Sequence, residues 1–120
     1  MHEIVQELTQ FRIQMKLYHW KTSFFSRHIG SDDFLEEFDK LTDKFVEVLS
    51  GSRNEKVNDK FTIKLSKLSD TTIKEYILGF RVWLCDTLPT LLMPQETDLL
   101  NLRDEMLANV NRLLYVFELR

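Results

Sequence analysis

The sequence predicts an all-α protein that folds as a single four-helix bundle. Apolar residues recur at three- and four-residue steps along four long segments of the 120 residues, which is the spacing of amphipathic helices. Only three glycines and two prolines are present, so few breaks interrupt these segments. A chain of this length buries one core rather than two, and we therefore expect one domain over residues 1–120.

The first helix is expected over about residues 3–23. Its buried stripe consists of apolar residues at helical spacing: Ile4, Leu8, Phe11, Met15 and Tyr18. A second apolar set lies on nearly the opposite side: Ile13, Leu17 and Trp20. A helix of a small bundle needs one buried face, so the second set predicts either a covering loop or a contact with another subunit.

The second helix is expected over about residues 31–50. Ser31 is a suitable N-cap, and the acidic residues that follow it suit the positive end of the helix dipole. Gly30 is a poor helix former, which favours a start after His28. Ser50-Gly51-Ser52 is typical of a helix end. The buried seam consists of Phe34, Phe38, Leu41, Phe45 and Val48.

Residues 51–69 are expected to cross along the bundle in an extended conformation, because apolar and polar residues alternate in KFTIKLSKLSD. The third helix then spans about residues 70–87 and the fourth about residues 95–118, with Pro89 and Pro94 between them. Their inward residues are Ile73, Tyr76, Ile77, Phe80 and Leu84, then Leu99, Leu102, Met106, Val110, Leu113 and Phe117. Two helical hairpins joined by one long crossover make a ferritin-like bundle.

Five carboxylates share one face of the second helix, directly away from its apolar seam: Asp32, Glu36, Asp39, Asp43 and Glu47. A charged stripe in this position is usually a solvated helix face. The spacing of the ligand-type residues favours a metal site instead. Asp43 and Glu47 lie four residues apart, as do His28 and Asp32, and such pairs are neighbours on a helix.

His19 precedes them at the end of the first helix, so imidazole and carboxylate occur together, a ligand set that iron accepts and zinc also binds. Asp32 and Asp43 are separated by about 16 Å of helix rise, too far to share one ion. The chain therefore carries two half-sites, His19/His28/Asp32 and Asp43/Glu47. Two chains with antiparallel second helices would join each half-site to its complement about a two-fold axis, giving two identical sites per dimer.

The segment from His19 to Glu47 resembles the iron-oxidation segment of the Dps-like mini-ferritins, and a viral or phage branch of that family is the suspected relative. The resemblance is carried by His19-Trp20, Phe24-Phe25, His28, Asp32 and Asp43…Glu47, with a shorter turn after His19 than is usual. It is specific over roughly residues 11–50 and architectural elsewhere. Classical ferritins fit less well, because they use an E-x-x-H pair that this chain lacks.

The resemblance implies a ferroxidase site between two subunits, with the same five residues as ligands to one or two iron ions: His19, His28, Asp32, Asp43 and Glu47. Fe(II) would be oxidised there by hydrogen peroxide or oxygen. The Fe(III) product would be stored in the hollow of a twelve-subunit shell. Trp20 would lie beside the iron as a redox-active neighbour, or would be an ordinary interface aromatic.

Composition excludes several other classes. Lys and Arg total 16 against 19 Asp and Glu, without a basic stripe, so nucleic-acid binding is not expected. Cys85 is the single cysteine, which excludes an internal disulfide and suits a reducing, cytoplasmic compartment. No apolar run approaches the length of a membrane span, and the N-terminus is unlike a secretory signal. A helical assembly protein without enzymatic activity and a metal-binding protein without turnover remain as alternatives.

Overall fold

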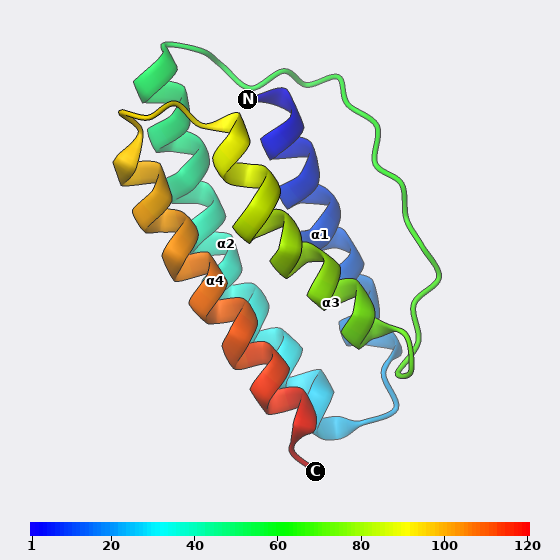
Figure 1. The fold of residues 1–120 in the computed structure, drawn as a ribbon. Coiled ribbons are helices and arrows are strands. Elements are labelled where there is room, and N and C mark those ends of the chain that lie inside the picture. The colour runs from blue at the N-terminus through cyan, green and yellow to red at the C-terminus, as the bar shows by residue number, and fades with distance from the viewer.

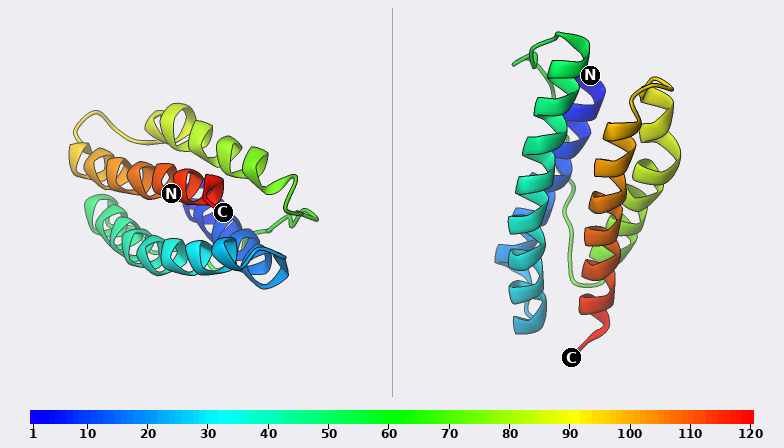
Figure 2. Two further views of the ribbon diagram at one scale, coloured as in Figure 1. Left: turned by 90° about the horizontal axis from the view of Figure 1, so that it is seen from below. Right: turned by 90° about the vertical axis from the view of Figure 1, so that its left-hand side faces the viewer.

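The computed structural model describes all 120 residues and contains four α-helices and no β-strand. α1 (His2–Lys21) and α2 (Phe25–Arg53) form one antiparallel hairpin, and α3 (Ile73–Val82) and α4 (Thr97–Glu118) form a second (Figure 1). The two hairpins pack as two layers, which are seen edge-on in the right-hand view of Figure 2. The all-helical prediction is therefore confirmed. None of the helices combines the length and apolarity needed to cross a membrane.

The helix bounds agree with the sequence at α1 and α4, to within two residues at each end, and disagree at α2. α2 begins at Phe25, so the predicted start after His28 is wrong. The helix continues through Gly30, where α4 packs so closely that a larger side chain would not fit. A Cβ added at Gly30 would lie 2.7 Å from Cγ1 of Val116. Ser31, predicted as the N-cap, is instead a fully buried residue inside the helix.

The end of α2 and the bounds of α3 also differ from those expected from the sequence. α2 continues past the predicted stop at Gly51 and ends at Arg53, where Asn54 adopts a left-handed conformation with φ of 52°. Asparagine tolerates this conformation better than most residues and is a common helix terminator. α3 begins at Ile73 and is prolonged by a π-helical turn, Trp83–Thr87, and a 3-10 turn, Leu88–Leu91. The connection expected between Pro89 and Pro94 is therefore partly helical, and residues 92–96 make the turn into α4.

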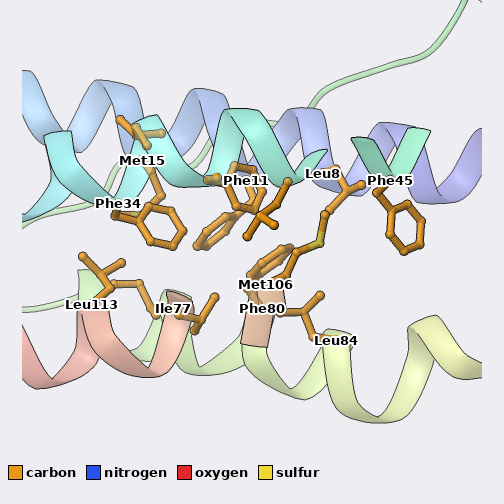
Figure 3. Packing of buried hydrophobic residues seen from close by; sticks show 14 of the residues in the cluster. Leu8, Phe11, Met15, Phe34, Phe45, Ile77, Phe80, Leu84, Met106 and Leu113 are labelled. Carbon is orange, nitrogen blue, oxygen red and sulfur yellow. The ribbon is translucent and has the colours of Figure 1, made fainter. Parts of the chain in front are cut away.

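The core is one cluster of 23 buried apolar residues contributed mainly by the four helices. Aromatic rings form its middle: Phe11 of α1 stacks on Phe80 of α3, with ring centroids 3.7 Å apart, and meets Phe34 and Phe38 of α2 edge-on. Figure 3 shows Met106 of α4 lying beside these rings. Because all four helices enclose the rings, the core fixes the outward directions of α1 and α2, where the predicted ligands lie.

The crossover lies along α1 and is held by glutamine side chains. Gln14 donates to the carbonyl of Ser66 at 3.2 Å and accepts a hydrogen bond from the N–H of Ser66. Gln10 accepts a bond from the N–H of Lys64 at 2.9 Å. Four residues of helix rise about 6 Å and two extended residues rise about 6.6 Å, so the two spacings match. The extended conformation predicted for this segment is therefore confirmed for its second half.

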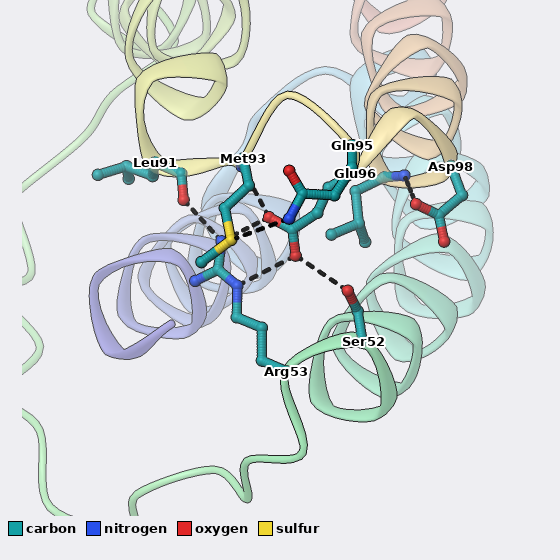
Figure 4. A network of polar contacts seen from close by, with 8 residues as sticks. Ser52, Arg53, Leu91, Met93, Gln95, Glu96 and Asp98 are labelled. Atoms are coloured by element: carbon teal, nitrogen blue, oxygen red, sulfur yellow. Dashed lines mark hydrogen bonds and ion pairs between the residues drawn. The ribbon is translucent and has the colours of Figure 1, made fainter.

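An ion pair closes the end of the bundle where α2 meets the α3–α4 connection (Figure 4). Arg53 donates to both carboxylate oxygens of the buried Glu96, at 2.8 and 3.1 Å. The hydroxyl of Ser52 and the N–H of Met93 also donate to this carboxylate. The hydrogen bonds from Arg53 lower the pKa of Glu96 from 4.5 to about 2, although burial opposes the shift. The connection before α4 is therefore fixed by a saturated carboxylate.

Candidate metal centre

His19 and His28 are brought together by the short turn between α1 and α2. Their imidazole rings stack with centroids 4.0 Å apart and an interplanar angle of 13°. His19 is 6% exposed and His28 is half-buried. Because α2 already begins at Phe25, His28 lies on the helix rather than on a connection, and its direction is fixed by helical geometry.

A polar network anchors this turn to the rest of the bundle. The Asp70 carboxylate accepts hydrogen bonds from Tyr18 at 2.7 Å and from Thr22 at 2.6 Å. Arg27 donates to the Asp70 carbonyl at 2.9 Å. Burial alone raises the pKa of the Asp70 carboxyl, but the hydrogen bonds from Thr22 and Tyr18 outweigh it, and the pKa is lowered overall. Asp70 therefore stays ionised and ties the end of the crossover to the turn that carries the histidines.

The ring nitrogens of the two histidines are not equivalent. Nδ1 of His28 lies 2.9 Å from the carbonyl oxygen of His19. A carbonyl can only accept, so in the neutral ring Nδ1 carries the proton and Nε2 keeps its lone pair. Nδ1 of His19 lies 2.9 Å from Oγ of Ser31, which leaves Nε2 of His19 outside that contact. A hydrogen bond at Nδ1 with Nε2 free is the usual arrangement of a metal-binding histidine.

Asp32 adds a carboxylate at the same place. Its Oδ1 lies 4.0 Å from Nε2 of His19, which is too long for a hydrogen bond. The side chain is 64% exposed and therefore free to rotate toward the imidazole. The structure thus gathers the predicted half-site His19/His28/Asp32. Within one chain, however, no three His, Cys, Asp or Glu side chains are placed to hold a metal ion together.

Asp43 and Glu47 are not brought to the histidines. Both are exposed, on the later part of the continuous helix α2. Asp43 lies about 16 Å of helix rise from Asp32. The two half-sites of one chain therefore stay apart, as the spacing predicts.

The intervening carboxylates of the stripe, Glu36 and Asp39, lie beside basic side chains, whereas Asp43 and Glu47 do not. Asp39 accepts a hydrogen bond from Arg12 at 2.6 Å, and Glu36 lies 4.0 Å from the ammonium of Lys40. Asp43 and Glu47 form no ion pair in the chain. Asp43 and Glu47 are therefore free of competing cations in the chain, although Asp33 and Glu37 on the same helix also form no ion pair.

Four large apolar side chains lie exposed near the histidine turn: Trp20, Phe24, Phe25 and Ile29, which are 66%, 50%, 78% and 45% exposed. The ring of Trp20 lies 5.4 Å from the ammonium of Lys16 and faces solvent rather than the core. The second apolar face expected on the first helix is therefore only partly covered. Exposed aromatics of this size on a small protein are typical of an interaction surface.

The profile of a family of unknown function, DUF5856, matches residues 19–117. The chain belongs to the DUF5856 family. No curated protein and no solved structure matches it. The part of the DUF5856 chain that matches begins at His19 and includes all five predicted ligands. All five candidate ligands therefore lie in the part of the chain that the family shares, and the family itself has no known function.

Sequence reasoning missed one residue of the centre. Ser31 was expected to cap a helix, but in the DUF5856 chain it is buried, with Oγ 2.9 Å from Nδ1 of His19 and 3.1 Å from the carbonyl of His28. Its position three residues after His28 is a weak signal, because serine at this spacing commonly bonds the preceding helical turn. Only the packing of α1 against α2 brings His19 to the same hydroxyl.

Proposed function

We propose that this DUF5856 chain is a subunit of a Dps-like mini-ferritin in which two chains together bind and oxidise Fe(II). The observation that carries the proposal is the stacked pair of His19 and His28, with the Asp32 carboxylate 4.0 Å from Nε2 of His19. The unpaired Asp43 and Glu47 on the same helix supply the complementary carboxylates. The all-helical bundle with its crossover along α1 is consistent with a ferritin-like fold.

The donor chemistry fits iron. Imidazole nitrogen and carboxylate oxygen are the donors of non-haem iron sites, and zinc substitutes in such sets. One chain offers His19, His28 and Asp32, and a second chain would add Asp43 and Glu47 across a two-fold axis with antiparallel α2 helices. The exposed aromatic side chains around the turn would then be covered by the second chain. The complete set would hold one or two metal ions at each of two identical sites.

Fe(II) is the substrate of the proposed reaction. Two ferrous ions each lose one electron, and both electrons, with two protons, cleave the O–O bond of hydrogen peroxide to give two waters. The residues of the chain bind the ferrous ions and hold them within reach of the oxidant. The ferric product would then be stored in the cavity of a closed shell, for which the resemblance implies twelve subunits.

The exposed apolar surface favours a second candidate: a homo-oligomeric assembly protein or metal-binding protein that does not turn over. Such a protein needs the contact between chains but not the oxidation. Solution mass distinguishes a dimer from a closed shell of twelve. Crystals soaked with iron or zinc separate a metal-binding protein from an assembly protein, because density between His19 and a neighbouring Glu47 requires a metal site, and peroxide consumption then separates binding from oxidation.

Peroxide consumption with Fe(II) tests the activity directly. We expect the purified protein to consume peroxide faster than Asp43→Asn plus Glu47→Gln protein, which lacks both carboxylates of one half-site. Glu37→Gln plus Glu105→Gln is the matched control, since it removes the same charge from two exposed positions outside the stripe. Equal rates for the wild type and the first double variant would refute the proposal.

Mixing two inactive variants tests whether the site is shared between chains. One variant carries His28→Gln plus Asp32→Asn, and the other carries Asp43→Asn plus Glu47→Gln. After joint refolding at equal concentration, half of the dimers are mixed and each of these has one intact site, so we expect about a quarter of the wild-type rate. A mixture as inactive as either variant alone would exclude pooling of ligands between two chains.

A further inference from the structure

Ser31 is a fully buried serine inside a long helix, and its hydroxyl has two neighbours. Oγ lies 2.9 Å from Nδ1 of His19 and 3.1 Å from the carbonyl oxygen of His28. Serine has no intrinsic preference for a helix interior. Since a buried hydroxyl has to be paired, the two contacts determine which of the three groups carries each proton.

Counting protons selects one pattern. The hydroxyl has one proton, and the carbonyl of His28 can only accept it. If Ser31 donates to that carbonyl, Nδ1 of His19 donates to Oγ, and both contacts are hydrogen bonds. If Ser31 donated to Nδ1 instead, two acceptor oxygens would face each other at 3.1 Å without a proton between them. The first pattern satisfies every contact.

The three residues then form a closed ring of hydrogen bonds. His28 donates through Nδ1 to the carbonyl of His19, His19 donates through Nδ1 to Ser31, and Ser31 donates to the carbonyl of His28. Each link joins α1 to α2 or closes a turn of α2. Both imidazoles are thus held by Nδ1, which accounts for their nearly parallel stacking at 4.0 Å.

We propose that Ser31 is a positioning residue that keeps His19 protonated on Nδ1 and so presents the Nε2 lone pair to a divalent cation. This role rests on the proposed function only in its last step, the binding of metal. The Asp32 carboxylate lies on the same side of the helix pair, with Oδ1 4.0 Å from Nε2 of His19. The cations suited to such an imidazole and carboxylate pair are borderline ones such as Fe(II), Co(II) and Zn(II).

Long-range ¹⁵N–¹H NMR of histidine-labelled apo-protein tests the first step, at alkaline pH where the rings are neutral. We expect both His19 and His28 to be protonated on Nδ1. In Ser31→Ala protein, His19 should lose this preference while His28, held by the His19 carbonyl, keeps it. A wild-type spectrum with His19 protonated on Nε2 overturns the proposal without any variant, and so does an unchanged His19 in the variant.

Zn(II) titration against a chromophoric chelator tests the second step. We expect Ser31→Ala to weaken Zn(II) binding by about 10- to 100-fold, the usual effect of losing the hydrogen-bond partner of a ligating histidine. Ser26→Ala, at a half-buried position of the same helix, is the matched control and should bind as the wild type does. Equal affinity in Ser31→Ala would overturn the positioning role.

The two proposals fail in different ways. If Zn(II) binding depends on Ser31 but Fe(II) causes no peroxide consumption, the oxidation proposal fails and the role of Ser31 stands. If peroxide consumption depends on Asp43 and Glu47 but His19 is protonated on Nε2, the role of Ser31 fails and the oxidation proposal stands.

Discussion

Replacing Glu96 by glutamine should destabilise the protein in a pH-dependent way. The lowering of its pKa from 4.5 to about 2 corresponds to about 3.5 kcal/mol, at about 1.4 kcal/mol for each pKa unit. The Glu96 side chain is only 2% exposed, yet that of Arg53 is 12% exposed and the pair lies at the end of the bundle (Figure 4). Solvent screening therefore reduces the expected contribution to about 2 kcal/mol.

The sign follows from the direction of the shift. Because the pKa is lower in the folded state, the stabilisation is complete above the unfolded-state pKa of 4.5 and is lost as the pH falls toward about 2. At about pH 3, roughly 40% of it should remain. Glu96→Gln also leaves the guanidinium of Arg53, with a side chain 12% exposed, without its charged partner. The variant should therefore be about 2–4 kcal/mol less stable than wild type at neutral pH.

Urea unfolding followed by far-ultraviolet circular dichroism measures both effects. We expect the difference between wild type and Glu96→Gln to shrink by about 1 kcal/mol between pH 7 and about pH 3. Glu118→Gln is the control, because the hydrogen bond from Lys74 also lowers the pKa of Glu118 but this pair is exposed, so no measurable change is expected. A difference that stays constant with pH, or that is absent at neutral pH, would refute the reasoning.

Two further substitutions test the packing of the bundle. Gly30→Ala should destabilise the protein by about 1–3 kcal/mol, because its Cβ would lie 2.7 Å from Cγ1 of the stiff Val116. Gly79→Ala, with nothing within 4 Å of the added Cβ, should stabilise it by about 0.5–1 kcal/mol. Thermal unfolding of both variants tests this, and a change of stability in the same direction for both would contradict it. Gln14→Ala should release the crossover, because both hydrogen bonds between Gln14 and Ser66 are lost. We expect faster amide hydrogen exchange at Ser66 and a loss of about 1 kcal/mol in the free energy of unfolding. Unchanged exchange at Ser66 would show that other contacts hold the crossover.

The start of α2 shows where sequence reasoning stops. Gly30 costs a helix about 1 kcal/mol in propensity, and Ser31 followed by acidic residues is a reasonable capping signal. The structure overrides both, because close packing of Val116 requires the missing Cβ and the Ser31 hydroxyl bonds to groups on both sides. Interactions between residues distant in sequence outweigh local preferences of this size. No single-sequence pattern contains them.

The candidate centre also has some features that the sequence predicts and others that only the packing of the helices produces. The four-residue spacings of His28 with Asp32 and of Asp43 with Glu47 are visible in the sequence, and the helix makes each pair neighbours. The stacking of His19 on His28 depends on the length of the turn and on its anchoring by Asp70, 42 residues beyond His28. Hydrogen-bond partners of ring nitrogens follow from that contact and have no signature in the residue order.

The order of the residues is enough to predict four amphipathic helices, an extended crossover and an outward face of ligand-type residues. It does so because periodicity is a local property: a helix repeats every 3.6 residues whatever lies beside it. The tertiary structure alone decided where α2 begins, that Asp39 is neutralised by Arg12 while Asp43 is not, and which nitrogen of each imidazole is held. These properties depend on the separation of atoms from different helices, which only the packed core fixes.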